Sequence, residues 1–218
     1  MATIMQPEHH HERTVIGGPT MEAIAGGAAV VLAIIGLAGM EPRFLVSISG
    51  IALGIAFIFD GGMVATEYSK ILSRSGGGDI ENVEFGGGLG AQVMAGISVI
   101  VLGVLSLLNL DPLVLMPISA IILGAAMVFT SGVSARLNTL KIETSGNQEV
   151  AKQVARQALS ASTGLDLVVG FSAIVLGILA LIGLSTLPLT LVAMLALGAS
   201  VLLGGSAISS KMVGLFTS

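Results

Sequence analysis

The sequence predicts an all-α integral membrane protein with six transmembrane helices, arranged as three tandem repeated antiparallel hairpins. Of its 218 residues, 54% are hydrophobic and 10% are charged, whereas about 25% of the residues of a typical soluble domain are charged. The mean hydropathy is +0.98. The apolar residues come in runs of about twenty, the length of helix that crosses a hydrocarbon core roughly 30 Å thick. Short and long polar connections alternate between these runs.

Six apolar segments are long enough to span a membrane as helices. They run from Thr20 to Met40, Arg43 to Thr66, Leu89 to Leu110, Pro112 to Ala135, Gly164 to Leu184 and Leu187 to Ser209. Only one or two residues separate the members of each successive pair: Glu41-Pro42, Asp111 and Ser185-Thr186. Connections this short force the two helices of a pair to run antiparallel.

The hairpins therefore occupy residues 20–66, 89–135 and 164–209, and polar segments connect them. These segments are an N-terminal tail (1–19), two linkers (67–88 and 136–163) and a C-terminal tail (210–218). In the second linker, Val150, Val154 and Ala158 are spaced by four. This spacing predicts a short amphipathic helix that either lies on the membrane surface, contacts a partner or extends the linker.

The distribution of basic residues predicts the orientation in the membrane. Eight of the nine lie on the side of the termini and the long linkers: Arg13, Lys70, Arg74, Arg136, Lys141, Lys152, Arg156 and Lys211. Arg43 alone lies on the side of the short connections. Because short loops rich in Lys and Arg stay in the cytoplasm, we expect both termini to be cytoplasmic.

An internal repeat, at an offset of 70 and then 74 residues, relates the three hairpins. The equivalent small residues are Gly26, Gly96 and Gly170; Ala33, Gly103 and Gly177; and Gly54, Gly124 and Gly198. In lipid, small residues let helix backbones approach closely and so drive helix association. We expect these nine residues to pack helices within the chain and between chains.

The central repeat also carries a resemblance to a known family. It reads Gly96-Ile97-Ser98-Val99-Ile100-Val101-Leu102-Gly103-Val104-Leu105, then Asp111-Pro112, then Ile118-Ser119-Ala120-Ile121-Ile122-Leu123-Gly124, and it ends at Gly132. This unit resembles the two-helix repeat of the HdeD-type membrane proteins, a prokaryotic acid-resistance-associated family. The resemblance implies six helices in three hairpins within a prokaryotic cytoplasmic (inner) membrane. It carries over no catalytic residue.

Polar residues at repeat-related positions are the candidate functional groups. Glu22, Gln92 and Asp166 each lie four residues, about one helical turn, before Gly26, Gly96 and Gly170. They either form a polar ring at a cytoplasmic mouth or satisfy free N–H groups in the first turn of their helices. Asp60 has Thr130 and Gly204 as its counterparts. As a candidate intramembrane acid it either binds an ion or substrate, or is a locally bonded carboxylate at the membrane rim.

Two further sets of residues are open to two interpretations each. Glu41, Asp111 and Ser185 are equivalent residues near prolines, and their position favours helix capping over external proton sensing. His9, His10 and His11 are weak metal-ligand candidates, because consecutive histidines point in different directions on a helix whereas metal sites draw ligands from separated positions. A solvated tail is the favoured alternative.

Composition excludes several classes of function. The chain has no cysteine, which excludes disulfides, iron–sulfur clusters and thiolate metal sites. Its net charge of −4 argues against nucleic acid as a partner. No catalytic set and no cofactor are expected. The sequence favours a non-enzymatic structural or accessory component of a membrane assembly or envelope stress response, with lipids and either its own copies or other membrane subunits as partners. The alternative is a small channel or permease.

Overall fold

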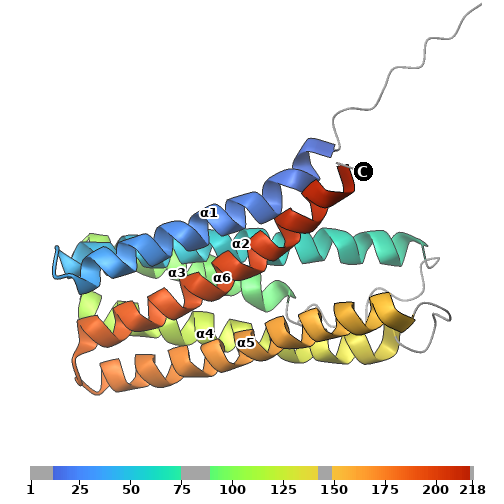
Figure 1. The fold of residues 1–218 in the computed structure, drawn as a ribbon. Coiled ribbons are helices and arrows are strands. Elements are labelled where there is room, and N and C mark those ends of the chain that lie inside the picture. Colours follow the sequence, from blue (N-terminus) through green and yellow to red (C-terminus); the bar gives the residue numbers. More distant parts are fainter. Residues whose placement is uncertain (1–11, 75–88, 142–148, 217–218) are drawn as a thin grey trace, which may run out of the picture.

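The computed structural model describes residues 12–74, 89–141 and 149–216, with side chains for residues 21–62, 90–131 and 164–204. The regular structure in these residues is entirely α-helical (Figure 1). The six helices are α1 (Glu12–Leu37), α2 (Pro42–Arg74), α3 (Leu89–Leu107), α4 (Pro112–Lys141), α5 (Glu149–Leu181) and α6 (Thr186–Phe216).

Five of the helices contain an apolar stretch long enough to cross a membrane. These stretches are Pro42–Gly62, Gly90–Leu107, Pro112–Ser131, Gly164–Leu181 and Thr186–Gly204. The apolar stretch of α1, Met21–Leu37, is shorter among the described residues. The prediction of an all-helical fold is therefore confirmed for the described residues, five of whose helices are long and apolar enough to cross a membrane. The arrangement of six spans stays a prediction.

The helices extend beyond the predicted apolar segments at the end of the molecule where the long linkers lie. Helix α2 continues to Arg74 and α4 to Lys141, while α1 already begins at Glu12. The short amphipathic helix predicted near residues 148–159 is not a separate element, because α5 runs without a break from Glu149. Residues 149–163 contain no proline and many good helix formers, so nothing in this sequence ends the helix. Polarity marks where the apolar stretch ends, not where the helix ends.

Three tight turns join α1 to α2, α3 to α4 and α5 to α6 at the opposite end, which we call the turn end (left in Figure 1). The end that carries the long linkers is the linker end. Each turn contains a residue with a left-handed backbone after the first helix: Gly39 (φ 90°), Asn109 (φ 64°) and Gly183 (φ 94°). Their N–H groups donate to the carbonyls of Gly36, Ser106 and Ala180 at 3.0–3.1 Å. Glycine and asparagine are the residues that tolerate this conformation best.

A second left-handed residue precedes each following helix. These residues are Glu41 (φ 39°), Asp111 (φ 40°) and Ser185 (φ 46°), and together with the first three they are all the positive-φ residues that the described ranges contain. Their carbonyls accept the first hydrogen bonds of α2, α4 and α6. Helices α2 and α4 begin at Pro42 and Pro112, as expected for proline at the first helical position. Helix α6 begins at Thr186, so Pro188 lies inside its first turn.

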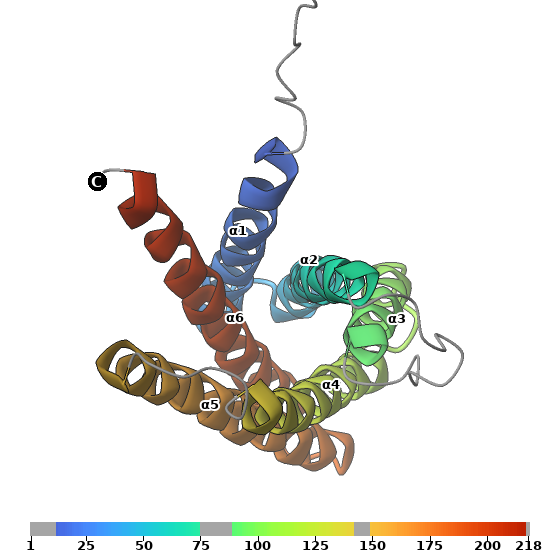
Figure 2. The same ribbon diagram turned by 90° about the vertical axis from the view of Figure 1, so that its right-hand side faces the viewer.

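The six helices pack in a closed order in which each contacts its neighbours along the chain and α6 contacts α1 (Figure 2). Helices α2, α4 and α6 also contact one another, so they form the interior of the bundle. Helices α1, α3 and α5 lie outside. Their equivalent residues Val31, Val101 and Val175 are 52–55% exposed. Exposed apolar side chains in mid-helix are the side chains that face lipid in a membrane protein.

Buried apolar side chains fill the interior at mid-height. Leu53, Leu123 and Leu197 occupy equivalent positions on the inner helices, and all are completely buried. Gly50, Ala120 and Met194 form a second equivalent set, in which a Cβ added to Gly50 would lie 3.8 Å from Met194 Cε. The long side chain of Met194 in the third hairpin thus fills the space beside Gly50 in the first hairpin.

Candidate functional site: a buried acidic cluster

Close contacts between glycines fix how the outer helices sit against the inner ones. At the α2–α3 contact, a Cβ added to Gly54 would lie 2.7 Å from the carbonyl oxygen of Gly96, and one added to Gly96 would lie 2.5 Å from that of Gly54. Gly124 and Gly170 repeat this at the α4–α5 contact, at 2.5 and 2.7 Å. No side chain fits where backbones approach this closely. We call these contacts seams.

The seam between α1 and α6 has the same design but is wider. Cβ atoms added to Gly26 and Gly198 would each lie 3.1 Å from the carbonyl oxygen of the other residue. The next position along this seam explains the difference, because the completely buried Ala33 stands where the other two seams have Gly103 and Gly177. The Cβ of Ala33 needs space, so the two backbones stay farther apart.

All nine small residues predicted to pack helices are buried inside the chain. They are Gly26, Ala33, Gly54, Gly96, Gly103, Gly124, Gly170, Gly177 and Gly198. Contacts between helices of the same chain occupy the glycines of the three seams. These residues therefore leave no glycine face on the surface of the bundle for contacts between chains.

The seams carry the candidate polar residues into the interior at the linker end. Glu22 and Gln92 are each only 4% exposed, and Asp166 is half-buried. Each lies on the same helix face as the seam glycine one turn away. The neighbouring residues Met21 and Met94, in contrast, are 52% and 67% exposed. The sequence-predicted polar groups thus point inward.

The first-turn explanation of these polar residues is wrong for two of them. Helix α1 begins at Glu12 and α5 at Glu149, so Glu22 and Asp166 lie well inside their helices. Residues this far from a helix start have no free N–H groups to satisfy. Gln92 alone lies near the start of its helix, which begins at Leu89. The burial of Glu22 and Asp166 therefore needs another reason.

Asp60 is bonded across the α2–α3 seam. The side-chain amide of Gln92 donates a hydrogen bond from Nε2 to Asp60 Oδ2. The single hydroxyl hydrogen of Thr130 has two acceptors within reach, the carbonyl of Ala126 at 2.7 Å and Gln92 Oε1 at 3.5 Å. Asp60 is thus a locally bonded carboxylate, and the chain of polar groups runs from α2 through α3 to α4.

Asp166 has a partner that the sequence analysis missed. The hydroxyl of Ser200 on α6 donates to Asp166 Oδ1 on α5. Ser200 is the equivalent of Ala56 and Ala126, so it is the one polar residue of its repeat-related set. A serine where the other two repeats have alanine was the sequence feature that could have identified this partner of Asp166.

Glu22 is the exception in this cluster. Its Oε2 atom is the one buried side-chain nitrogen or oxygen, among the described side chains, that has no hydrogen-bond partner. Its carboxyl group experiences the charges of Asp60 and Asp166, and Asp60 experiences that of Asp166. We call Glu22, Asp60, Gln92, Asp166 and Ser200 the acidic cluster. Among the described side chains the one Lys or Arg is Arg43, which lies near the turn end.

The acidic cluster is not a ready-made metal site. Within the described residues, no group of three or more His, Asp or Glu side chains could hold a metal ion. His9, His10 and His11 lie outside the described residues. The cluster therefore offers hydrogen-bond acceptors and negative charge rather than a preformed coordination shell.

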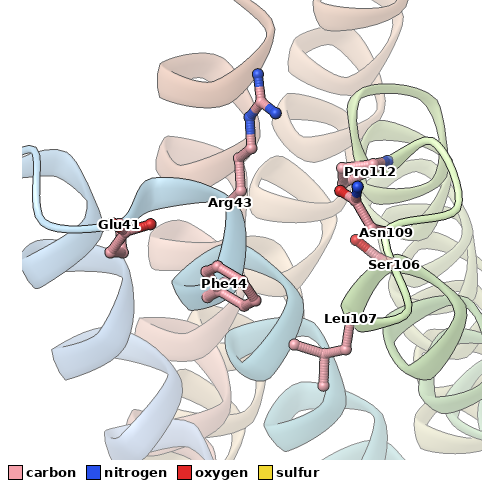
Figure 3. Close-up of a pocket in the computed structure, with 7 residues that line it drawn as sticks. All are labelled: Glu41, Arg43, Phe44, Ser106, Leu107, Asn109 and Pro112. Carbon is pink, nitrogen blue, oxygen red and sulfur yellow. The ribbon is translucent and has the colours of Figure 1, made fainter.

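A second polar location lies at the turn end, in a pocket between the α1–α2 and α3–α4 turns (Figure 3). Its lining residues are Glu41, Arg43, Phe44, Ser106, Leu107, Asn109 and Pro112. Beneath it, the buried hydroxyls of Ser47 and Ser106 lie 2.6 Å apart in a hydrogen bond. Figure 3 shows the Arg43 side chain extending away from the Glu41 carboxylate. This pocket holds residues that shape the turns, whereas the acidic cluster holds a polar atom without a partner.

Comparisons with protein-family models, curated proteins and solved structures found no match to this chain.

Proposed function

We propose that the chain is an integral membrane protein that crosses the bilayer six times as three hairpin repeats around a pseudo-threefold axis, and that it is a non-enzymatic structural or accessory component of a membrane assembly. The observation that carries this proposal is the recurrence of one glycine contact at three seams. Gly54 with Gly96 and Gly124 with Gly170 repeat in Gly198 with Gly26, which links the last helix to the first.

Two features of the bundle support a structural role. Buried apolar residues such as Leu53, Leu123 and Leu197 fill the interior at mid-height. The outer helices present apolar side chains, among them Val31, Val101 and Val175, which suit lipid acyl chains or the helices of a membrane partner. Because the glycines are used within the chain, a second copy or another subunit would meet the outer faces of α1, α3 and α5. A prokaryotic inner membrane belongs to this proposal as an implication of the HdeD resemblance, and cytoplasmic termini belong to it as an implication of the charge distribution.

The membrane topology can be tested with single cysteines, because the chain has none of its own. Met40→Cys, Leu110→Cys and Leu184→Cys place a thiol at equivalent exposed positions of the three turns. Ser75→Cys and Ser145→Cys place one in each linker. A membrane-impermeant maleimide should label the three turn positions from one side of the membrane and the linker positions from the other. Turn positions labelled from different sides would contradict six spans.

The assembly role can be tested by the mass of the protein released from native membrane vesicles. A component of an assembly should appear as a complex heavier than the 21.9 kDa chain. Glycine variants are unsuitable for disrupting such a complex, because they would disturb the fold. The variant Leu110→Cys changes only an exposed turn residue, so its complex should have the same mass as that of the unaltered protein. A lone monomer in native membranes would contradict the assembly role.

The second candidate function is a small permease, and the unpartnered Glu22 carboxyl oxygen favours it. A buried, ionisable group inside a membrane bundle is a functional candidate because its burial is costly. Flux of a small solute into liposomes containing the purified protein tests this candidate. Selective flux that disappears in the variant Glu22→Gln with Asp166→Asn would overturn the purely structural role, and the absence of flux would overturn the permease.

A further inference from the structure

We propose that the acidic cluster is a binding site for a small organic cation of the alkylammonium or guanidinium type, held between α1, α2 and α5 at the linker end of the bundle. The ligand would place its N–H groups against the carboxylates of Glu22, Asp60 and Asp166. The site is distinct from the helix-packing role, and its existence is tested by binding rather than by flux.

The unpartnered oxygen of Glu22 is the first step of the argument. The Glu22 side chain is 4% exposed and its Oε2 atom has no hydrogen-bond partner. The side chain lies on the buried face of α1, in line with Gly26 and the completely buried Ala29. Its Oε1 atom faces Gly204 on α6, one helical turn after Ser200, whose hydroxyl bonds Asp166. Buried acceptors are nearly always paired in folded proteins, and an unpaired one marks the place of a missing donor.

The balance of donors and acceptors gives the charge of the ligand. Gln92 Nε2 donates to Asp60, and Ser200 Oγ donates to Asp166. The Oε2 atom of Glu22 receives no such donor. A ligand that brings positive charge and N–H or O–H donors would stabilise three carboxylates in one place, since burying unpaired negative charge is strongly unfavourable. A cation that donates hydrogen bonds supplies both.

The spacing of the carboxyl groups favours an organic cation over a metal ion. A metal ion needs its oxygen ligands within about 2.6 Å of one centre, and no group of three acidic side chains among the described residues is placed to hold one. Hydrogen bonds from a charged nitrogen to a carboxylate span about 2.7–2.9 Å each. A guanidinium group also spreads its donors over three nitrogens, as in arginine. A guanidinium ligand therefore reaches carboxylates that are farther apart than those around one metal ion, and an alkylammonium nitrogen binds fewer of them at once.

The depth of the three carboxyl groups sets the orientation of such a ligand. A Cβ added to Gly204 on α6 would lie 3.7 Å from Glu22 Oε1, so this carboxyl group lies against the backbone of α6. Asp60 and Asp166 are half-buried, whereas Glu22 is fully buried. The completely buried apolar residues of the core lie beneath the site. Glu22 would bind the inner part of the ligand.

Isothermal titration of the purified full-length protein in detergent tests this proposal, with methylammonium and methylguanidinium chloride as probes. Sodium, magnesium and choline chloride serve as comparison cations. We expect saturable binding of at least one of the two N–H-bearing probes. Glu22→Gln should weaken it by about tenfold or more, the effect of losing one hydrogen bond to a charged group. The matched control is Glu41→Gln at the turn end, which should bind with unchanged affinity.

Three results would overturn the proposal. They are no saturable binding of either probe by the folded protein, equal binding by Glu22→Gln, and sodium or magnesium binding that displaces both probes. Should Glu22→Gln fail to fold, as judged by its circular dichroism spectrum, Asp60→Asn takes its place, and unchanged binding there would equally overturn the site. Binding without liposome flux would contradict the permease function and leave this site standing.

Discussion

Gly26 on the first helix and Gly198 on the last meet backbone to backbone, since a Cβ added to either residue would lie 3.1 Å from the carbonyl oxygen of the other. This is the contact that Gly54 makes with Gly96, displaced by one repeat. A linear array of repeats would leave its first and last helices without partners. Here the two terminal helices pair with each other, so each of the six helices has a neighbour on both sides.

The widths of the seams predict different costs of adding a methyl group. Gly124→Ala places a Cβ 2.5 Å from a backbone oxygen, which cannot move without shifting its helix. Gly198→Ala places one at 3.1 Å from its nearest neighbours. We expect Gly124→Ala to lower the free energy of unfolding by about 1–3 kcal/mol, as overpacking does, and Gly198→Ala to lower it by less. Unfolding in a denaturing detergent measures both.

Gly50→Ala is the control for this comparison. Its added Cβ would make ordinary contacts, at 3.6–3.9 Å, with Met116 Sδ, Met194 Cε and Val99 Cγ1. The variant should therefore unfold like the unaltered protein or be slightly more stable, because alanine favours a helix. If Gly50→Ala lowered the free energy of unfolding as much as Gly124→Ala, the close backbone contacts at the seams would not be the cause of the destabilisation.

The tight turns predict an asymmetry between two equivalent positions. Gly183 and Asn109 both have a left-handed backbone, with φ of 94° and 64°. Gly183→Ala introduces a Cβ into this conformation and should destabilise the protein by about 1 kcal/mol. Asn109→Gly should leave stability within about 0.5 kcal/mol or raise it. Thermal unfolding of the two variants checks the signs, and equal losses would contradict the turn geometry.

The hydrogen bond between Ser47 and Ser106 predicts energetic coupling between two buried residues on α2 and α3. The two hydroxyl oxygens lie 2.6 Å apart. Ser47 is 1% exposed and Ser106 is 5% exposed. Ser47 also donates to the carbonyl of Arg43 at 2.9 Å, so the buried hydroxyl keeps a partner when Ser106 is removed. A double-mutant cycle of Ser47→Ala and Ser106→Ala should give a coupling energy of about 0.5–1.5 kcal/mol. Strict additivity of the two losses would count against this bond.

The bond between Gln92 and Asp60 predicts the effect of removing its donor. Gln92→Leu leaves the Asp60 carboxylate without this partner and should cost about 1–3 kcal/mol of stability. Ser172→Ala is the control, because its hydroxyl is exposed and bonds only the carbonyl of Val168 within its own helix. That variant should change stability by less than about 0.5 kcal/mol. Equal losses of stability for the two substitutions would contradict the hydrogen bond between Gln92 and Asp60.

The repeat made much of the fold predictable from the sequence. Small residues at offsets of 70 and 74 marked the positions where the helices approach most closely, because only glycine or alanine permits such contacts in a membrane bundle. Glu41, Asp111 and Ser185 marked the starts of the inner helices. The helix ends at the linkers were not predictable, since the segment after Glu149 is polar and yet contains good helix formers.

The acidic cluster was only partly predictable. Glu22, Gln92 and Asp166 were identified from their shared position, and the structure places all three toward the interior. Which partner each one finds depends on the side chains of the facing helix, where the repeat is not kept: Asp60, Thr130 and Gly204 are equivalent residues of very different chemistry. Glu22 faces the glycine of this set and so has no donor.

The closure of the first helix onto the last is the central claim, and an intramolecular disulfide tests it most directly. A Cβ added to Gly198 would lie 3.3 Å from that of Ala29, which is about 0.2 Å shorter than the usual Cβ–Cβ distances of disulfides. The variant carrying Ala29→Cys and Gly198→Cys, with a protease site in the segment 142–148, should on oxidation in the membrane yield two fragments that separate only after reduction. Fragments that separate without reduction, or that are joined equally well when Val31→Cys replaces Ala29→Cys, would contradict the closed bundle.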